Sequence, residues 1–222
     1  MKNGKKLIAV IHTSFVSVND LKELFAEKIP EALVHNIVDD SLLAEVMQNG
    51  SVTPAIIRRV CNYAVHAEMI GADLIFNQCS SVGEAVNVAR SLVKVPYIKV
   101  DEPMASEAVR LGERITVVAT VASTMKPSTS LVQQAADKAG KNIKIKECLV
   151  DGALDILMKE GNREKHNQLV LDAIKKIENE SDVIVLAQGS MIVLLPLLKG
   201  IKVPVLTSPA MGVENARKVL GL

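Results

Sequence analysis

The sequence has 222 residues, and its 26 basic and 25 acidic side chains nearly balance. Hydrophobic residues make up 49% of the chain, but aromatic residues make up only 2%. No basic run is interleaved with aromatic residues, which argues against nucleic-acid binding. The core has to be built from aliphatic side chains, as in buried parallel strands.

The apolar stretches are too short for a targeting or membrane segment. The N-terminal run, Leu7–Ile11, stops at His12, whereas the apolar region of a signal peptide needs about 7–15 residues. The longest other run, Met191–Leu198, is far below the roughly 20 residues of a membrane span. Three cysteines without paired spacing do not indicate a disulfide framework. We expect a soluble, reduced, cytoplasmic protein with no membrane partner.

Short apolar runs alternate with helical patterns along the whole chain. The predicted strands are Leu7–Ile11, Ala32–Val38, Leu74–Phe76, Tyr97–Val100, Ile115–Ala119, Ile143–Val150, Val183–Leu186 and Val203–Leu206. The predicted helices are Val18–Ala26, Ser41–Met47, Pro54–Met69, Glu84–Leu92, Pro103–Gly112, Ser128–Ala139, Ala153–Met158, Glu164–Glu178 and Gly212–Leu220. This alternation predicts an α/β protein with mainly parallel sheets and helices on both faces.

Three segments of the first half recur in the second half in the same order. KVPYI at 94–98 recurs as KVPVL at 202–206, ADLIFNQCSS at 72–81 aligns with SDVIVLAQGS at 181–190, and LIAVIHT at 7–13 aligns with ITVVATV at 115–121. The offsets are 108, 109 and 108 residues, too long for a solenoid repeat of about 20–50 residues. We predict two pseudosymmetric Rossmann-like lobes, residues 1–98 with 208–222 and residues 99–207, with the active site in the cleft between them.

Small polar residues follow four of the predicted strands. These strand ends are His12-Thr13-Ser14, Cys79-Ser80-Ser81, Thr120 to Thr124, and Gln188-Gly189-Ser190. In open parallel sheets, ligands bind beyond the carboxyl ends of the strands. Hydroxyl groups and free backbone N–H groups at helix starts suit a carboxylate or a phosphate.

Cys79 is the candidate reactive group. Ser81 to Glu84 form a capping-box pattern, which predicts that a helix begins two residues past the thiol. The dipole of that helix favours the thiolate, so the thiol is a candidate base or nucleophile. The alternative is a small buried core residue. Cys61 and Cys148 lie inside a helical and a strand pattern, and we expect both to be inert packing residues.

The sequence carries no pattern of a metal or cofactor site. His35, His66 and His166 lie inside predicted elements without metal-ligand spacing, and the glycines form neither a dinucleotide fingerprint nor a P-loop. His12 ends the first strand, and both a structural role and a role in the site are open. We expect no metal and no cofactor.

These residues resemble the aspartate/glutamate/hydantoin racemase superfamily. The resemblance is carried by Cys79-Ser80-Ser81, by ATVAST at 119–124 and by VLAQGSM at 185–191, and it spans essentially the whole chain. It implies cofactor-independent proton transfer at the carbon beside a carboxylate, typically by two cysteines that face each other across the substrate. Cys79 matches the first of these cysteines. The habit of the family also suggests a homodimer.

The resemblance implies that small hydroxyl residues hold the carboxylate of the substrate. Together with the other strand-end residues, the expected substrate-binding set is His12, Thr13, Ser14, Ser80, Ser81, Thr120, Thr124, Gly189 and Ser190.

Gln188 departs from the family pattern. It stands where the second cysteine is expected, and the internal duplication aligns it with Cys79. An amide cannot act as a general acid near neutral pH, but it can donate hydrogen bonds to an enolate-like intermediate. We therefore expect Cys79 and Gln188 as the catalytic pair, with His12, Ser190 or water as the source of the missing proton.

Three functions are compatible with this pattern. The first is a racemase or epimerase, an isomerase that acts on an amino acid or a related small carboxylate. The second is a single-thiol lyase or decarboxylase, although in the decarboxylases of this family the thiol occupies the second-lobe position. The third is a carboxylate-binding or regulatory protein without turnover.

Overall fold

The computed structural model describes residues 4–222, which divide into two compact units. The first lobe comprises Met1–Val100 and Pro209–Leu222, and the second lobe comprises Asp101–Ser208. The boundaries expected from the sequence, after residues 98 and 207, lie two residues and one residue earlier in the chain.

The first lobe is built on a four-stranded parallel sheet. Its strands are β1 (Leu7–His12), β2 (Leu33–Val38), β3 (Leu74–Asn77) and β4 (Tyr97–Lys99), in the order β2-β1-β3-β4. The strands match the four apolar runs of the first half of the sequence. The central strands β1 and β3 are buried along their whole length, because helices cover both faces of the sheet.

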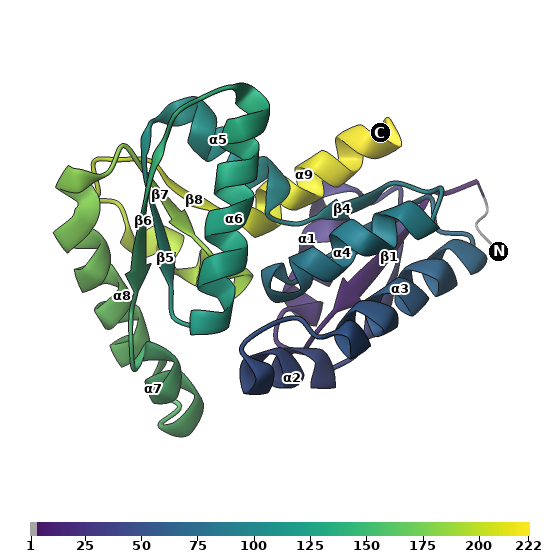
Figure 1. The fold of residues 1–222 in the computed structure, drawn as a ribbon, viewed down its shortest axis with the longest axis horizontal. Coiled ribbons are helices and arrows are strands. Elements are labelled where there is room, and N and C mark those ends of the chain that lie inside the picture. Colours follow the sequence, from purple (N-terminus) through teal and green to yellow (C-terminus); the bar gives the residue numbers. More distant parts are fainter. Residues whose placement is uncertain (1–3) are drawn as a thin grey trace. The chain divides into compact units, whose positions relative to one another are not determined.

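Helices lie on both faces of the sheet of the first lobe (Figure 1), and two separate apolar clusters form its core, one on each face. Helices α3 (Pro54–Met69) and α4 (Gly83–Ala89) cover one face, and α1 (Val18–Lys28) and α9 (Ser208–Leu220) cover the other. The remaining helical segments of this lobe are α2 (Ser41–Asn49) and the 3-10 helices η1 (Ser80–Val82) and η2 (Arg90–Leu92).

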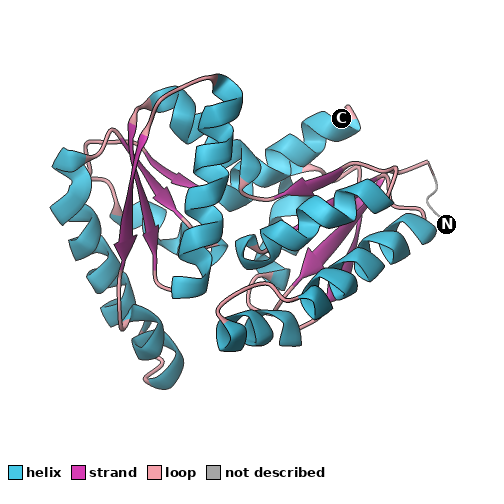
Figure 2. Cartoon of the chain, viewed as in Figure 1, coloured by secondary structure: helices cyan, strands magenta, loops and turns pink. Residues whose placement is uncertain are grey.

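The second lobe repeats this plan. Its strands are β5 (Arg114–Ala119), β6 (Lys144–Leu149), β7 (Val183–Leu186) and β8 (Val205–Thr207), in the order β6-β5-β7-β8, all parallel. Its helices are α5 (Glu102–Leu111), α6 (Ala122–Ala139), α7 (Ala153–Lys159), α8 (Arg163–Ile177), η3 (Glu178–Glu180) and η4 (Gly189–Leu197). Figure 2 shows the alternation of strands and helices in both lobes. Both the α/β architecture and the internal duplication are confirmed.

One of the three predicted alignments between the halves is wrong by one residue. The amide of Asp73 bonds the carbonyl of Leu7 in the first lobe, and the amide of Asp182 bonds the carbonyl of Arg114 in the second. Leu7 therefore corresponds to Arg114 and not to Ile115. Because both first strands are apolar along their length, a slip of one residue leaves the sequence alignment plausible although it exchanges the two faces of the strand.

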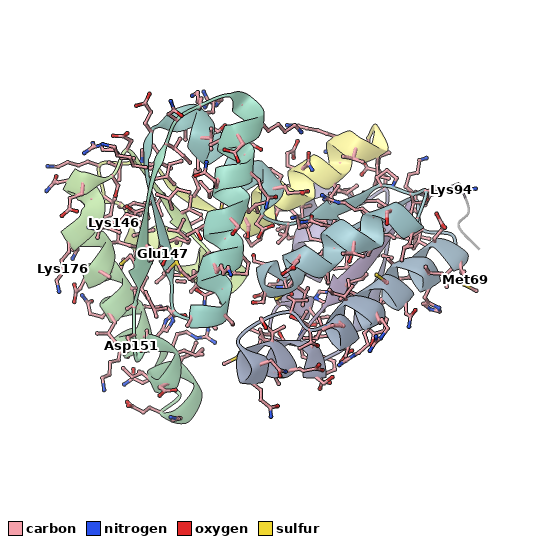
Figure 3. The ribbon with its side chains drawn as sticks, in the orientation of Figure 1. Met69, Lys94, Lys146, Glu147, Asp151 and Lys176 are labelled. Carbon is pink, nitrogen blue, oxygen red and sulfur yellow. The ribbon has the colours of Figure 1, made fainter. Side chains whose placement is uncertain are left out.

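The edge strand of the second sheet, β6, carries exposed charged side chains. β6 pairs only with β5 among the described strands, and its side chains Lys146 and Glu147, labelled in Figure 3, are exposed. Charged side chains on an edge strand oppose pairing with another chain. Among residues 4–222, no helix combines the length and the apolar character that a bilayer crossing requires.

Two helices begin at least four residues earlier than the sequence predicts. Helix α6 begins at Ala122 and not at Ser128, because Pro127 lies inside the helix near its start, where only one intrahelical bond is lost. Helix α9 begins at Ser208 and not at Gly212. Gly212 is needed for close packing: a Cβ atom on it would lie 2.6 Å from the carbonyl oxygen of Val100.

The substitution Gly212→Ala tests this contact by the sign of its effect on the free energy of unfolding. Helix propensity alone would stabilise the protein by about 1 kcal/mol. The overlap with Val100 is expected to reverse the sign and to lower the free energy of unfolding by about 1–3 kcal/mol. The measurement is urea unfolding followed by circular dichroism. Gly200→Ala is the control, because a Cβ atom there meets nothing within 4 Å; a stabilised Gly212→Ala protein would contradict the packing explanation.

Candidate active site

The sheet of the first lobe brings two of the predicted strand ends together. β1 and β3 are neighbours, with Ile11 opposite Asn77. The amide of Gln78 donates to the carbonyl of Ile11 at 3.1 Å, which extends the pairing by one residue. The next residue along the chain is Cys79, so the thiol-bearing turn lies at the same sheet edge as Thr13, the residue that follows β1.

Cys79 directly precedes a helical segment. Its backbone is extended, η1 begins at the following residue, and α4 begins at Gly83. The predicted cap at Ser81 is wrong, since Ser81 lies inside η1, and the residues that precede η1 and α4, Cys79 and Val82, make no side-chain cap bond. The helical N–H groups nevertheless start closer to the thiol than expected, which favours an anion at this position.

Asn77 is a site residue that the sequence does not reveal. It is fully buried, and its Nδ2 donates to the backbone carbonyl of Cys79 at 2.7 Å. The amide thereby fixes the backbone that carries the thiol. Asn77 ends an apolar strand, and only the bond it makes two residues further on shows its role.

A buried lysine lies on the neighbouring strand. Lys99 stands opposite Asn77 in the β3–β4 register and is 5% exposed. Its ammonium donates to Oδ1 of Asn87 at 3.1 Å, and a Cβ atom on Gly83 would lie 3.5 Å from its Cδ. Lys99 therefore runs past the start of α4 and adds positive charge near the turn that follows Cys79.

His12 is fully buried at the end of β1. Its Nε2 lies 2.9 Å from Oδ1 of Asn36. An amide oxygen can only accept, so Nε2 carries the proton. Burial lowers the pKa of His12 below its usual value and outweighs the bond to Asn36, which raises it. Among the described residues, Nδ1 has no hydrogen-bond partner.

The carboxylate of Asp39, which follows β2, is hydrogen-bonded to three side chains of the first lobe. Asp39 accepts hydrogen bonds from Arg59, Tyr63 and Ser41. Although burial raises its pKa, these bonds prevail and hold the pKa at about 2. Arg59 also pairs with Glu45 of α2, at 2.7 Å. The network thus ties α2 to α3, and α2 packs against η1.

The remaining thiols lie in less reactive surroundings. Cys61 is buried in α3, and Cys148 is partly buried in β6. Burial raises the pKa of both thiols. Cys79 is partly buried like Cys148, but it lies at a strand end and directly precedes a helical segment.

In the second lobe the corresponding strand ends also meet. The amide of Ala187 donates to the carbonyl of Val118 at 2.9 Å, which extends the pairing of β7 with β5. The next residue is Gln188. Its Oε1 accepts from the backbone N–H of Thr120 at 2.8 Å, and its Nε2 donates to Oγ1 of Thr120, also at 2.8 Å. Gln188 and Thr120 therefore form a closed pair.

The other predicted residues of the second lobe surround this pair along the chain. Thr124 is buried in the first turn of α6, Gly189 begins η4, and Ser190 is exposed. Among the described residues, no side chain caps the 18-residue helix α6. Uncapped N–H groups at a helix start favour a bound anion.

Within residues 4–222, no group of three or more His, Cys, Asp or Glu residues is placed to hold a metal ion.

The sequence profile of the Asp/Glu/Hydantoin racemase family matches residues 8–216. No curated protein shows significant sequence similarity to the chain.

Several solved racemases share the fold. Glutamate racemase from Francisella tularensis subsp. tularensis, in complex with D-glutamate, superposes with a TM-score of 0.76 at 13% identity, covering 100% of this chain and 82% of that chain. Glutamate racemase RacE1 from Bacillus anthracis gives 0.74 at 15% identity, covering 97% and 82%. Allantoin racemase from Klebsiella pneumoniae gives 0.66 at 20% identity, covering 98% and 89%.

The two-lobed fold is thus shared with these solved racemases. The chain belongs to the Asp/Glu/Hydantoin racemase family.

The setting of the three thiols predicts selective alkylation. At pH 7.5, iodoacetamide should modify Cys79 at least about ten times faster than the other two, because the reagent needs both access and thiolate. Peptide mass spectrometry over time measures the three rates. In Cys79→Ser protein the fast phase should vanish, and unfolding in urea should make the thiols equally reactive. Faster labelling of Cys61 or Cys148 would contradict this assignment.

The buried His12 predicts a loss of stability in acid. The unfolded chain binds a proton on this histidine near pH 6.5, whereas the folded protein does so only at lower pH. The contribution of His12 to stability is therefore complete above pH 6.5 and is lost as the pH falls toward the folded pKa.

Urea unfolding at pH 8.0 and 5.5 measures this effect. His12→Gln should lose part of the decrease in unfolding free energy that the wild type shows between the two pH values. His66→Gln, on the exposed side of α3, should retain the full decrease. Equal pH dependence in all three proteins would show that His12 does not titrate on unfolding.

Proposed function

We propose that this protein is a cofactor-independent racemase or epimerase that transfers a proton at the Cα atom of an amino acid or a related small carboxylate. The observation that carries the proposal is the setting of Cys79. Its partly exposed thiol precedes a helical segment directly, and Asn77 fixes its backbone. Membership of the racemase family agrees with this chemistry.

In the proposed reaction, Cys79 acts as the base. Its thiolate takes the Cα proton, so the C–H bond breaks, an S–H bond forms and the electron pair moves into the carboxylate to give an enediolate. The positive charge of Lys99 and the N–H groups of η1 favour the thiolate that starts this step. Positioned bases of this kind contribute about 10²–10⁴-fold to a rate.

Residues from both lobes bind the substrate in this proposal. The hydroxyl and backbone donors that we assign to the carboxylate are Thr13, Ser14, Ser80, Ser81, Thr120, Thr124, Gly189 and Ser190. Preorganised donors at strand ends and helix starts stabilise the charge that grows on the carboxylate as the proton leaves. We assign His12, whose ring is fully buried, to support of the β1 end and not to direct contact.

Water delivers the replacement proton in this proposal. Gln188 aligns with Cys79 in the duplication, but its amide carries no titratable proton near neutral pH. A proton taken from solvent gives product that contains one solvent hydrogen at Cα, whichever enantiomer is supplied.

A second candidate function is carboxylate binding without turnover. It is favoured by the pair that Gln188 forms with Thr120, because this position then contributes hydrogen bonds only. Both functions share the same ligand class and differ in whether Cys79 reacts.

Hydrogen exchange in D₂O separates the two functions. A panel of α-substituted carboxylates, including both enantiomers of aspartate, glutamate, hydroxy acids and hydantoin-derived acids, is incubated with the protein and followed by NMR and chiral chromatography. For at least one compound the wild type should exchange the Cα hydrogen and interconvert the enantiomers. Cys79→Ser should lower that rate by about 10²–10⁴-fold.

Cys148→Ser is the matched control and should keep the wild-type rate, because Cys148 lies in the edge strand β6. Binding without exchange across the whole panel would exclude the racemase and leave the binding protein. Carbon dioxide release from a malonate-type compound would instead identify a decarboxylase.

A further inference from the structure

Gln188 and Thr120 exchange two hydrogen bonds within the second lobe. Oε1 of Gln188 accepts the backbone N–H of Thr120, and Nε2 donates to Oγ1 of the same residue, both at 2.8 Å. Thr120 is 7% exposed and follows β5 directly, two residues before α6 begins. One side chain thus contacts both the backbone and the hydroxyl of a residue at the start of a helix.

Chemistry fixes the orientation of this amide. A backbone N–H can only donate, so the atom of Gln188 that faces it has to be the oxygen. The opposite orientation would place an NH₂ group against an N–H group. Nε2 therefore faces Oγ1 of Thr120, and because an amide NH₂ can only donate, Oγ1 is the acceptor of that bond.

This arrangement determines what the Thr120 hydroxyl can do. Oγ1 already accepts from Gln188, so its own proton points away from Gln188 and is available to an acceptor. Within the described residues of the second lobe, the bond from Gln188 is the one hydrogen bond observed for this hydroxyl. The hydroxyl lies beside the uncapped start of α6, where anions are favoured.

We propose that Gln188 is a positioning residue that converts the Thr120 hydroxyl into a fixed hydrogen-bond donor for a carboxylate oxygen of the ligand. A thiol at position 188 is too short, and too weak a donor and acceptor, to hold both groups of Thr120. With glutamine at this position, the side chain cannot transfer a proton, but it holds the Thr120 hydroxyl in one orientation as a donor. The inference rests on the proposed carboxylate ligand, but not on turnover.

Gln188→Glu tests the polarity of the pair with almost no change of shape. A glutamate carboxylate still accepts the Thr120 N–H, but it also accepts the Thr120 hydroxyl proton, which then turns away from the ligand. The probe is acetate, titrated at pH 7.5 and followed by the ¹H–¹⁵N shifts of the Ala122, Ser123 and Thr124 amides. The variant should bind acetate at least about ten-fold more weakly than the wild type.

Two controls separate hydroxyl polarity from charge and from folding. Gln134→Glu makes the same change of charge on the exposed side of α6 and should alter acetate affinity less than two-fold. The Thr120 amide should remain protected from hydrogen exchange in Gln188→Glu, which shows that the first bond and the fold are kept. Gln188→Asn, which is too short to reach both groups, serves as the variant if Gln188→Glu does not fold.

A double-mutant cycle with Thr120→Val gives the decisive result. Without the hydroxyl, Gln188→Glu retains only its charge repulsion, so its effect on acetate affinity should shrink by at least about five-fold. An equal effect in both backgrounds overturns the inference, as does a wild type whose α6 amides do not respond to acetate. If Gln188 and Thr120 are coupled but no Cα hydrogen exchanges, the inference is supported and the racemase is excluded. If the Cα hydrogen exchanges but the two residues are not coupled, the racemase is supported and the inference is overturned.

Discussion

Each lobe depends on one backbone hydrogen bond beyond the regular end of its sheet. In the first lobe the amide of Gln78 donates to Ile11, and in the second the amide of Ala187 donates to Val118. Each bond holds the chain that leaves the third strand against the first strand. The residue that follows, Cys79 or Gln188, is thereby brought to the carboxyl edge of a buried parallel sheet, where ligands of α/β proteins bind.

The corrected alignment makes the two edges directly comparable. Since Leu7 corresponds to Arg114, Thr13 corresponds to Thr120, and each lobe has a threonine after its first strand. In the second lobe that threonine is held by Gln188, whereas in the first lobe the equivalent of Gln188 is a thiol. The two lobes thus share one backbone plan and differ in the side chain at this equivalent position, a thiol in one and an amide in the other.

The strands could be predicted well because apolar runs bounded by polar residues mark buried parallel strands. Helix starts were less predictable where one residue had two possible meanings. Pro127 was interpreted as a boundary although it lies within α6, and Gly212 was interpreted as a helix start although it allows α9 to approach Val100. At Gly212 a tertiary contact, and not local propensity, decides the outcome.

The candidate site also contains features that the sequence predicts and features that it does not predict. Cys79 and Gln188 could be proposed as a pair from the sequence because the duplication aligns them. The long-range hydrogen bonds of the two lobes could not: His12 bonds Asn36, Arg59 bonds Asp39, and Gln188 bonds Thr120 across separations of 24, 20 and 68 residues. No local pattern states which distant group a side chain will meet. Composition shows that such polar groups need partners, and only the fold shows which ones.

The return of α9 to the first lobe has a consequence for the order in which the protein can form. Val213 and Ala216 of this helix complete the apolar cluster that contains Ile8 and Val10 of β1. During synthesis the ribosome releases β1 early, but α1 covers only part of this face of its sheet, and the rest stays uncovered until α9 emerges. All the elements of the second lobe are made before that moment, so the lobe that starts the chain is the last to be completed, the reverse of the usual N-terminal-first order.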